Sequence, residues 1–208
     1  MKIKGFNDTI QWYNSNAASY ASSIQNIPSK DQIDDFISLL PQGALILDAG
    51  CASGRDSKIM HEKGKKVIGI DLSTELIKIA KKNNPEIQFV EGNFLHLPFE
   101  DDHFDGIWSH ASLLHFESID EVLKSLREFH RVLKTEGVIH IFVKEKKDKK
   151  FDVVTDSLSH HDRFFQYFTE DEMSEYMKKT GFKIIKLLHT SDPGGRKEVS
   201  WILILARK

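Results

Sequence analysis

The sequence predicts an α/β fold: a doubly wound, seven-stranded, mostly parallel sheet that ends in an antiparallel C-terminal hairpin strand. Short apolar runs alternate with amphipathic stretches between residues 44 and 143, as they do where buried parallel strands are joined by helices. A connection of about a dozen residues, containing Pro193, Gly194 and Gly195, joins the last two apolar runs. That connection suits a hairpin better than a helical crossover.

The expected strands are short and rich in aliphatic residues, and they lie at 44–47, 67–70, 87–90, 104–109, 138–143, 182–188 and 201–206. The expected helices carry apolar side chains at helical spacing, and they lie at 30–40, 55–63, 74–82, 118–133 and 169–181. Capping boxes open two of them, at Ser118 with Glu121 and at Thr169 with Glu172. Such alternation predicts crossovers that cover both faces of the sheet with helices.

The bulk composition predicts one domain over residues 1–208, because 208 residues with 40% apolar content supply one sizeable core. Lysine and arginine (29) nearly balance aspartate and glutamate (31), so neither nucleic acid nor a membrane is expected as partner. No apolar run approaches the ~20 residues of a membrane span. The single cysteine, Cys51, cannot form an internal disulfide and lies in no metal-ligand spacing. We therefore expect a cytoplasmic protein, monomer or homodimer, without a metal site.

The segment ALILDAGCASGRDS, residues 44–57, carries the most informative pattern. Gly50 and Gly54 bracket the turn from the first strand into a helix, whose N-terminus offers free N–H groups to a polar ligand. Asp71 ends the next strand, 21 residues after Gly50, where a carboxylate accepts hydrogen bonds from ribose hydroxyls. Together these features predict a nucleoside site at the carboxyl ends of the strands; the alternative is a purely structural turn.

The same turn indicates which nucleoside cofactors are disfavoured. A dinucleotide fingerprint requires glycine at positions 50, 52 and 55, whereas this chain has Ala52 and Arg55. The sequence also lacks the GxxxxGK[ST] segment that cradles a triphosphate. A nicotinamide oxidoreductase is thus only a minor alternative.

The ordered segments LILDAGCASGRDS, VIGIDLS, QFVEGNFLHLPF, FDGIWSHASLLHF and LREFHRVLKTEGVIHIF resemble the successive motifs of class I S-adenosylmethionine-dependent methyltransferases. The resemblance covers most of the chain. It implies the Rossmann-like methyltransferase fold, S-adenosylmethionine as cofactor and a small molecule as methyl acceptor. The alternative is a regulatory domain that binds S-adenosylmethionine without catalysis.

The resemblance implies a set of cofactor-binding residues: Tyr20, Asp48, Gly50, Ala52, Gly54, Arg55, Asp71, Leu72, Asn93 and Phe94. Residues 48–54 would line the methionine end, Asp71 would hold the ribose, and Leu72 and Asn93 would meet the adenine. Two positions depart from the family pattern, which more usually has glycine at 52 and aspartate at 93. Alanine permits a tight turn if its φ is negative, and Asn93 either accepts the adenine N–H or is a turn residue.

Two histidines of WSHASLLHF, His110 and His115, follow the fourth strand and are the catalytic candidates. Each is a residue type that takes a proton from an acceptor hydroxyl or thiol, and the alternative is that both are hydrogen-bonded packing residues. Orientation of the reactants supplies on the order of 7–11 kcal/mol of barrier lowering, so a general base is not required.

Two further segments are expected to border the acceptor. Residues 1–28 resemble the helical lid of many family members, which would bring Tyr13, Asn16 or Tyr20 near the cofactor. Residues 144–168 begin with KEKKDKK, expected to be a solvated loop, and continue into a stretch that resembles the substrate side of the family. The acceptor candidates are Tyr13, His160, His161, Arg163 and Tyr167.

Overall fold

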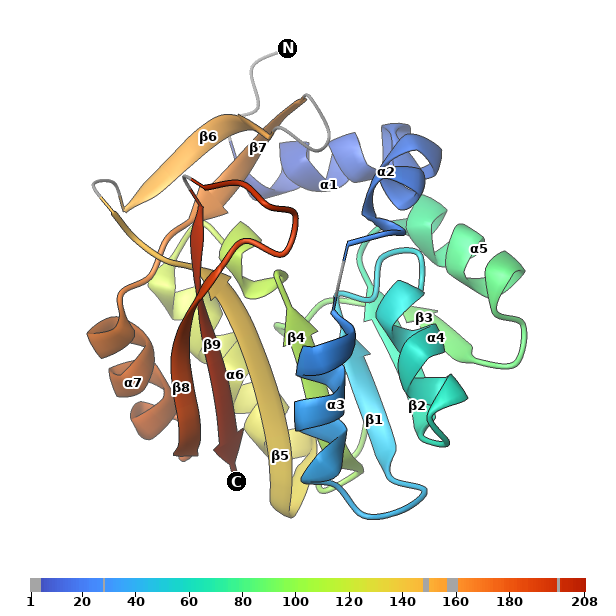
Figure 1. Cartoon of the computed structure of the whole chain (residues 1–208), viewed down its shortest axis with the longest axis vertical. Helices are drawn as coiled ribbons and strands as arrows, with labels where there is room; N and C mark the ends of the chain where they lie inside the picture. Colours follow the sequence, from blue (N-terminus) through green and yellow to red (C-terminus); the bar gives the residue numbers. More distant parts are fainter. Residues whose placement is uncertain (1–4, 28, 148–149, 157–160, 198) are drawn as a thin grey trace.

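The computed structural model describes residues 5–27, 29–147, 150–156, 161–197 and 199–208. Seven strands form one sheet in the order β3-β2-β1-β4-β5-β9-β8 (Figure 1). Their bounds are β1 Leu45–Ala49, β2 Lys66–Asp71, β3 Gln88–Glu91, β4 Phe104–His110, β5 Leu133–Lys144, β8 Lys183–Ser191 and β9 Ser200–Arg207. Strands β1 to β5 pair in parallel, and β9 is antiparallel to both β5 and β8. The predicted fold class is confirmed.

The helices between these strands are α3 Lys30–Ser38, α4 Arg55–Glu62, α5 Thr74–Asn83, α6 Ile119–Val132 and α7 Glu170–Lys179. Both predicted capping boxes are formed, at the starts of α6 and α7. One strand begins earlier than expected: β5 starts at Leu133, directly after α6, rather than at Val138. Leu133 pairs with Phe104 of β4, and the register shifts between Phe104 and Gly106. Because of this long-range pairing, residues 134–137, which have turn-forming character, are part of the strand.

Helices cover the sheet on both sides, with α3 and α4 on the near face in Figure 1 and α6 and α7 on the opposite face. Phe36 of α3 and Leu40, which follows the helix, show why this segment lies so close to β4. A Cβ added at Gly106 of β4 would lie 2.7 Å from a methyl carbon of Leu40 and 2.9 Å from the ring of Phe36. The missing side chain at position 106 thus leaves room for the apolar face of α3.

The carboxyl ends of the strands are roofed by segments from both ends of the chain (Figure 1). These are α1 Phe6–Ser15, α2 Ala17–Ile24, and a separate hairpin of β6 Phe151–Asp156 and β7 His161–Gln166. Two expectations need correction. Residues 144–168 contain this hairpin rather than only a loop, and Lys144, expected in solvent, is the last residue of β5 and 4% exposed. Its position beside β9 in the sheet buries it.

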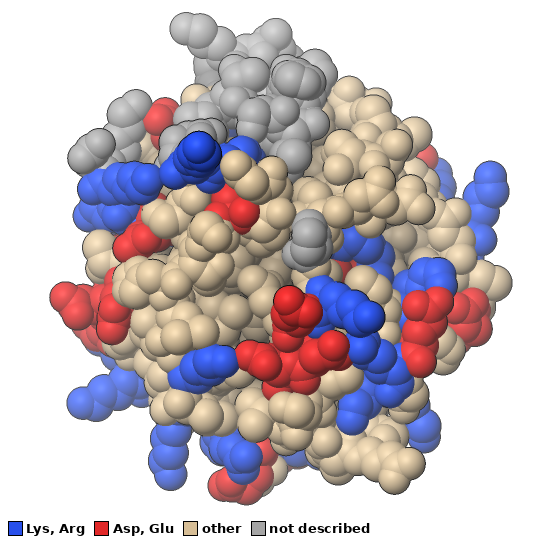
Figure 2. Space-filling view, in the orientation of Figure 1, with Lys and Arg blue, Asp and Glu red and all other residues tan. Residues whose placement is uncertain are grey.

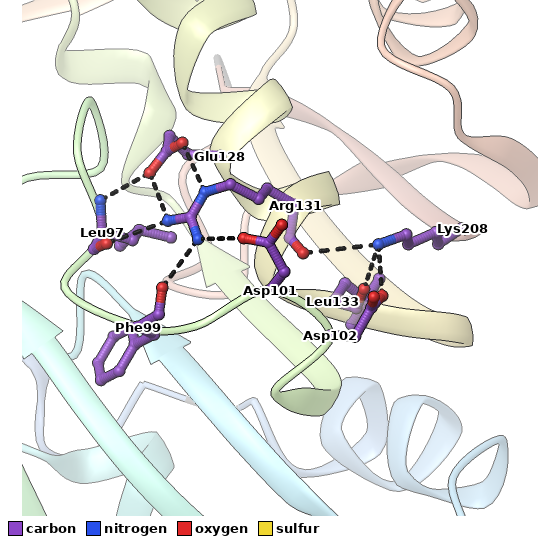
Figure 3. A network of polar contacts seen from close by, with 8 residues as sticks. All are labelled: Leu97, Phe99, Asp101, Asp102, Glu128, Arg131, Leu133 and Lys208. Carbon is purple, nitrogen blue, oxygen red and sulfur yellow. Dashed lines mark hydrogen bonds and ion pairs between the residues drawn. The ribbon is translucent and has the colours of Figure 1, made fainter.

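A polar network fastens the chain between β3 and β4 to α6 (Figure 3). The guanidinium of Arg131 donates to Glu128, to Asp101 and to the carbonyl oxygens of Leu97 and Phe99. Next to it, the ammonium of Lys208 donates to Asp102 and to the carbonyl oxygen of Leu133. The C-terminal residue and the connection before β4 are therefore held to the same end of α6.

The surface visible in Figure 2 carries acidic and basic side chains interspersed with one another. Among the residues that the structure describes, no helix is both long and apolar enough to cross a membrane.

Candidate functional site

A cavity lies at the carboxyl ends of the strands, beneath the roof of α1, α2 and β7. Counted with the solvent at its mouth, it has a volume of about 1330 Å³. Twelve of the residues predicted from the sequence line it: Tyr13, Tyr20, Asp48, Gly50, Ala52, Arg55, Asp71, Leu72, Phe94, His110, His115 and Arg163. Residues from positions 13 to 163 thus converge on one space.

The turn after β1 forms one wall of the cavity, and it depends on Gly50. This residue has a φ of +87°, and a Cβ added to it would lie 2.4 Å from the Cβ of Ser112. Both the left-handed backbone and the close approach therefore require glycine. The N–H groups of Gly50 and Cys51 donate to the carbonyl oxygen of Ile70, at 2.8 and 3.1 Å, which holds the turn against the end of β2.

The second glycine of the turn, Gly54, lies outside the cavity wall. Gly54 also has a left-handed φ, +81°, and precedes α4, but it is not among the lining residues. A Cβ there would meet Phe89 and Asn84 at 2.8 to 2.9 Å. Gly54 thus allows close packing against β3 and its preceding loop, away from the cavity.

Ala52 lines the cavity with a φ of +47°, so the turn is formed without the negative φ that was expected to be the condition for alanine. An alanine in the left-handed region is strained by roughly 1–2 kcal/mol. A hydrogen bond accompanies this conformation, because the N–H of Ala52 donates to Oδ2 of Asp71 at 2.9 Å. The turn after β1 and the carboxylate at the end of β2 are thus directly joined.

Asp71 receives a second backbone hydrogen bond on its other oxygen, from the N–H of Ser73 at 2.8 Å. Burial raises the pKa of Asp71, and the backbone N–H donors oppose that rise. Each carboxylate oxygen can accept more than one hydrogen bond, so both oxygens retain capacity for hydroxyl donors. The geometry suits a ligand with two neighbouring hydroxyl groups.

The acidic side chain at the end of β1 has unusual electrostatics. Asp48 is 2% exposed and accepts a hydrogen bond from the hydroxyl of Ser57. Burial, and then the nearby charge of Asp56, raise the pKa of Asp48 to about 8. Its carboxyl group therefore holds a proton at neutral pH.

Asp56 was not predicted as a site residue, although it lines the cavity from the first turn of α4. Burial alone would raise its pKa, but the adjacent Arg55, at 2.7 Å, holds that pKa below the usual value. Its other partners are the hydroxyl of Ser29 at 2.8 Å and Nε1 of Trp108 at 3.0 Å. Asp56 thus links the start of α3, α4 and β4. The signal in the sequence that could have identified it is an acidic residue in the first turn of the helix after the glycine-rich turn.

The ring of His110 stacks against the rings of His140 and Phe142 on the neighbouring strand β5, and its Nδ1 lies 3.3 Å from Nε2 of His140. Burial lowers the pKa of His110 to about 4 and that of His140 well below its usual value. Both rings are therefore neutral at pH 7. Because its pKa is so low, the ring of His110 binds a proton weakly, which weighs against His110 as a general base.

His115 has both ring nitrogens engaged. Its Nδ1 lies 3.0 Å from the carbonyl oxygen of Phe164, which only accepts, so Nδ1 carries the proton. Nε2 then accepts from the hydroxyl of Tyr13 at 3.0 Å. Tyr13 in turn accepts from Nη1 of Arg163 at 2.6 Å. This arrangement favours a packing role for His115.

Five other residues predicted for the site do not line the cavity or lie outside the described residues. Asn93 and Tyr167 are not among the lining residues, and the side chain of Asn93 accepts from the N–H of Leu95 at 2.9 Å, as in a turn. His160 and the side chain of His161 lie outside the described residues. Asn16, beside the cavity residues of α1 and α2, uses its side chain to donate to the carbonyl oxygen of Trp12.

The far end of the cavity contains residues that sequence reasoning missed. They are Lys144 of β5, Phe165 of β7, Trp201 of β9, and Asp192 and Arg196 of the β8–β9 connection. Lys144 ends β5, Asp192 follows β8, and Trp201 is near the start of the antiparallel strand β9, so these three lie at the edge of the sheet where the parallel strands end. Phe165 belongs to the separate β6–β7 hairpin. Only the pairing of β5 with β9 and the position of this hairpin bring these segments together.

The middle of the chain matches a family model described as a methyltransferase domain, over residues 47–141. A malonyl-[acyl-carrier protein] O-methyltransferase from Hamiltonella defensa subsp. Acyrthosiphon pisum is 36% identical over 94 residues, covering 45% of this chain and 35% of that protein. The probable tRNA methyltransferase 9B of Homo sapiens is 28% identical over 169 residues, covering 79% and 36% respectively. The chain thus spans little more than a third of the length of these relatives.

Solved structures share the fold over nearly the whole chain. The [4+2]-cyclase SpnF has a TM-score of 0.79 at 17% identity, with 100% of this chain and 98% of that chain covered. The 1,6-didemethyltoxoflavin-N1-methyltransferase of Burkholderia thailandensis, solved with 1,6-didemethyltoxoflavin and S-adenosylhomocysteine, has a TM-score of 0.76 at 22% identity, with 96% and 86% covered. At these identities the likeness concerns the fold alone.

Proposed function

We propose that this chain is a class I S-adenosylmethionine-dependent methyltransferase that transfers the methyl group of S-adenosylmethionine to a small-molecule acceptor. Residues 47–141, which match a methyltransferase domain, support the proposal. The observation that carries the proposal is the contact between the turn after β1 and the carboxylate at the end of β2. The N–H of Ala52 in that turn donates to Asp71 at 2.9 Å, and both residues line one cavity.

The residues present fit an adenosyl ligand. Gly50 keeps the turn open at a point where a Cβ would collide with Ser112, and Asp71 offers two carboxylate oxygens to ribose hydroxyls. Leu72 and Phe94 contribute apolar surface to the same cavity, which suits a purine ring. In this proposal the turn and Asp71 bind the nucleoside, while Tyr13 and Tyr20 close the cavity from above.

S-adenosylmethionine supplies a methyl group that is already strongly electrophilic, so the protein's task is to orient the acceptor and to exclude water. The buried Tyr13, 7% exposed, and the aromatic rings around it serve the second purpose. Orientation alone accounts for on the order of 7–11 kcal/mol of barrier lowering. The neutral His110 is therefore not needed as a base.

Binding and transfer are tested separately. Calorimetry with S-adenosylmethionine and S-adenosylhomocysteine should detect binding to the wild-type protein. Asp71→Asn should bind S-adenosylhomocysteine roughly 10- to 100-fold more weakly, since hydrogen bonds to a charged group contribute about 1.5–3 kcal/mol. Glu91→Gln is the matched control, because Glu91 ends the neighbouring strand β3 in register with Asp71 but does not line the cavity. Absence of binding by the wild-type protein would overturn the proposal.

The acceptor class is tested with methyl-labelled S-adenosylmethionine and a cell extract that is afterwards separated into small molecules, RNA and protein. The proposal expects label in the small-molecule fraction. Label in RNA would instead assign the kind of acceptor named for the tRNA methyltransferase relative, and binding without labelling would favour a regulatory domain. The cavity beneath α1, α2 and β7 and the mixed charges on the surface shown in Figure 2 favour the small molecule.

A further inference from the structure

The first turn of α5 is completed by a side chain from the roof. Ser73 is the N-cap of α5, and its hydroxyl oxygen accepts from the N–H of Leu76 at 3.3 Å. Another N–H of that turn, on Glu75, donates to Oδ1 of Asn14 at 3.2 Å. Asn14 belongs to α1, 61 positions earlier in the chain. The start of a helix leaves four N–H groups without partners inside the helix, and α1 supplies one of those partners here.

The orientation of the Asn14 amide follows from this contact. A backbone N–H can only donate, so the atom that faces Glu75 is the carbonyl oxygen of the side chain and not its NH2 group. The same oxygen accepts from the hydroxyl of Ser73 at 2.8 Å. Ser73 is fully buried, and its hydroxyl donates to Asn14 while it accepts from Leu76. One amide oxygen of α1 thus holds both the N-cap and the second residue of α5.

The same N-cap residue holds the carboxylate of the nucleoside site. The backbone N–H of Ser73 donates to Oδ1 of Asp71 at 2.8 Å, and Leu72 between them lines the cavity. Two successive hydrogen bonds therefore lead from Asn14 through Ser73 to Asp71. Asn14 itself is not among the lining residues, so any effect that it has on a ligand passes through its neighbours.

A small apolar cluster keeps α1 and α2 in the place that this contact requires. Tyr13 of α1 and Ala17 of α2 pack on Leu76 of α5, in a cluster that is separate from the main core among the described residues (Figure 1). Ala52, in the turn after β1, packs against the same cluster. A segment held by few buried apolar contacts opens at a lower free energy than the core. The contact of Asn14 with Ser73 thus depends on whether α1 is docked.

From these contacts we infer that Asn14 is a positioning residue of the nucleoside site. While α1 is docked on α5, the amide oxygen of Asn14 holds Ser73, and Ser73 holds Asp71 in the orientation that ribose hydroxyls require. This inference rests on the proposed function, since it concerns the cofactor site named there. Coupling between two sites acts in both directions, so a nucleoside on Asp71 also favours the docked state of α1.

Calorimetry with S-adenosylhomocysteine tests the contribution to affinity. Asn14→Ala should bind it roughly three- to tenfold more weakly than the wild type does, the size expected when one or two neutral hydrogen bonds are lost. Asn14→Asp keeps an acceptor oxygen, and a negative charge is favourable at a helix N-terminus, so its affinity should stay within about threefold of wild type. Equal affinity of Asn14→Ala and wild type would overturn the inference.

The matched control lies in the same turn of α5. The hydroxyl of Thr74 donates to Glu91 of β3 at 2.9 Å, away from the roof. Thr74→Ala therefore also removes one hydrogen bond from the start of α5, but its affinity for S-adenosylhomocysteine should stay within about twofold of wild type. A loss as large as that of Asn14→Ala would assign the effect to the start of α5 in general, and the role of Asn14 would be refuted.

A double-mutant cycle shows whether Asn14 acts through Ser73. Ser73→Ala removes the hydroxyl that donates to Asn14. If the two residues act in series, Asn14→Ala should weaken S-adenosylhomocysteine much less in the Ser73→Ala background than in the wild type. Equal effects in both backgrounds would show that Asn14 acts by another route, which contradicts the inference.

Amide hydrogen exchange provides a readout that a purely structural role would not change. In the wild type, S-adenosylhomocysteine should slow exchange in α1 and at residues 73–76. In Asn14→Ala, the ligand should still protect the turn after β1 but no longer protect α1. Equal protection of α1 by the ligand in both proteins would exclude the coupling. Asn14 belongs to neither apolar cluster, so Asn14→Ala should fold, and melting curves verify this. If it does not fold, Asn14→Gln, which moves the amide oxygen away from Ser73, replaces it with the same expectations.

The outcomes separate this inference from the proposed function. If S-adenosylhomocysteine does not bind the wild-type protein, the proposed function fails at its first step, and the role of Asn14 fails with it. If it binds the wild type and Asn14→Ala equally well, only the role of Asn14 fails, and the nucleoside site stands.

Discussion

The hydroxyl of Tyr13 lies 3.0 Å from Nε2 of His115, although 102 positions separate the two residues in the chain. Tyr13 belongs to α1 in the roof, and His115 belongs to the short helix η1, Leu113–His115, which follows β4. Arg163 of β7 donates to the same hydroxyl. One buried phenol thus connects α1, the short helix η1 after β4 and the β6–β7 hairpin.

Replacement of this phenol is the first prediction. Tyr13→Phe leaves Nε2 of His115 and Nη1 of Arg163 without the hydroxyl, and a buried group that loses its partner costs about 1–3 kcal/mol. We expect a loss of that size in the free energy of unfolding, measured by urea denaturation, together with faster amide exchange in α1. Tyr176→Phe, at a buried tyrosine of α7 away from the cavity, should change the free energy less. Equal effects of the two substitutions would show that the hydroxyl of Tyr13 does not stabilise the packing of α1 on the rest of the protein.

The second prediction concerns the turn after β1. Gly50→Ala adds a Cβ that would lie 2.4 Å from Ser112, at a φ of +87°, so both strain and collision oppose it. Gly64→Ala is the control, with a φ of +82° but nothing within 4 Å of its Cβ. Gly64→Ala should cost only the strain, roughly 1–2 kcal/mol. Gly50→Ala should cost more and should also weaken S-adenosylhomocysteine binding at least about tenfold, by calorimetry. Equal affinities of the two variants would contradict this role for Gly50.

The third prediction is a pH dependence that Asp48 causes. The pKa of its carboxyl group rises from an ordinary value of 3.8 to about 8 in the folded protein, so between these values the folded chain holds a proton that the unfolded chain has released. Stability must then fall as pH rises. Relative to Asp48→Asn, the wild-type free energy of unfolding should decrease from about pH 4 to about pH 8 and level off above that. Urea denaturation at a series of pH values measures it, and parallel profiles of the two proteins would refute it.

The fourth prediction concerns the network of Figure 3. Arg131→Ala removes hydrogen bonds to two carboxylates and to two backbone carbonyl oxygens. Because the side chain is 30% exposed, water offsets part of the loss, and we expect about 2 kcal/mol of destabilisation. That corresponds to roughly 4–8 °C in Tm for a chain of this size. Lys78→Ala, which removes an exposed pair with Glu75, should stay below about 0.5 kcal/mol.

The order of elements could be predicted because each strand and helix carries its own local signal. The run VIGID, the capping box at Ser118 and the glycine-rich turn at Gly50 are all contained within a few neighbouring residues. Local preferences and apolar periodicity act over that same range. They also predicted the antiparallel strand β9, since the short connection before it excludes a helical crossover.

Local signals failed where distant segments decide the conformation. Ala52 takes a positive φ because the turn packs on β2 and its N–H meets Asp71. Lys144 is in a run of charged residues, KEKKDKK, that predicts a solvated loop, yet pairing with β9 and the ring of Phe165 enclose it. These contact partners lie farther along the chain than the short stretch of residues over which apolar periodicity is assessed.

The sequence by itself determined the fold class and the position of the turn at 48–54 beside Asp71, because both lie at the ends of consecutive strands whose parallel pairing brings those ends together. Only the tertiary structure decided which residues form the rest of the cavity. Tyr13, His110, Lys144 and Arg163 come from four separate elements, and their burial depends on segments that are distant in the chain rather than on their own neighbours in the chain.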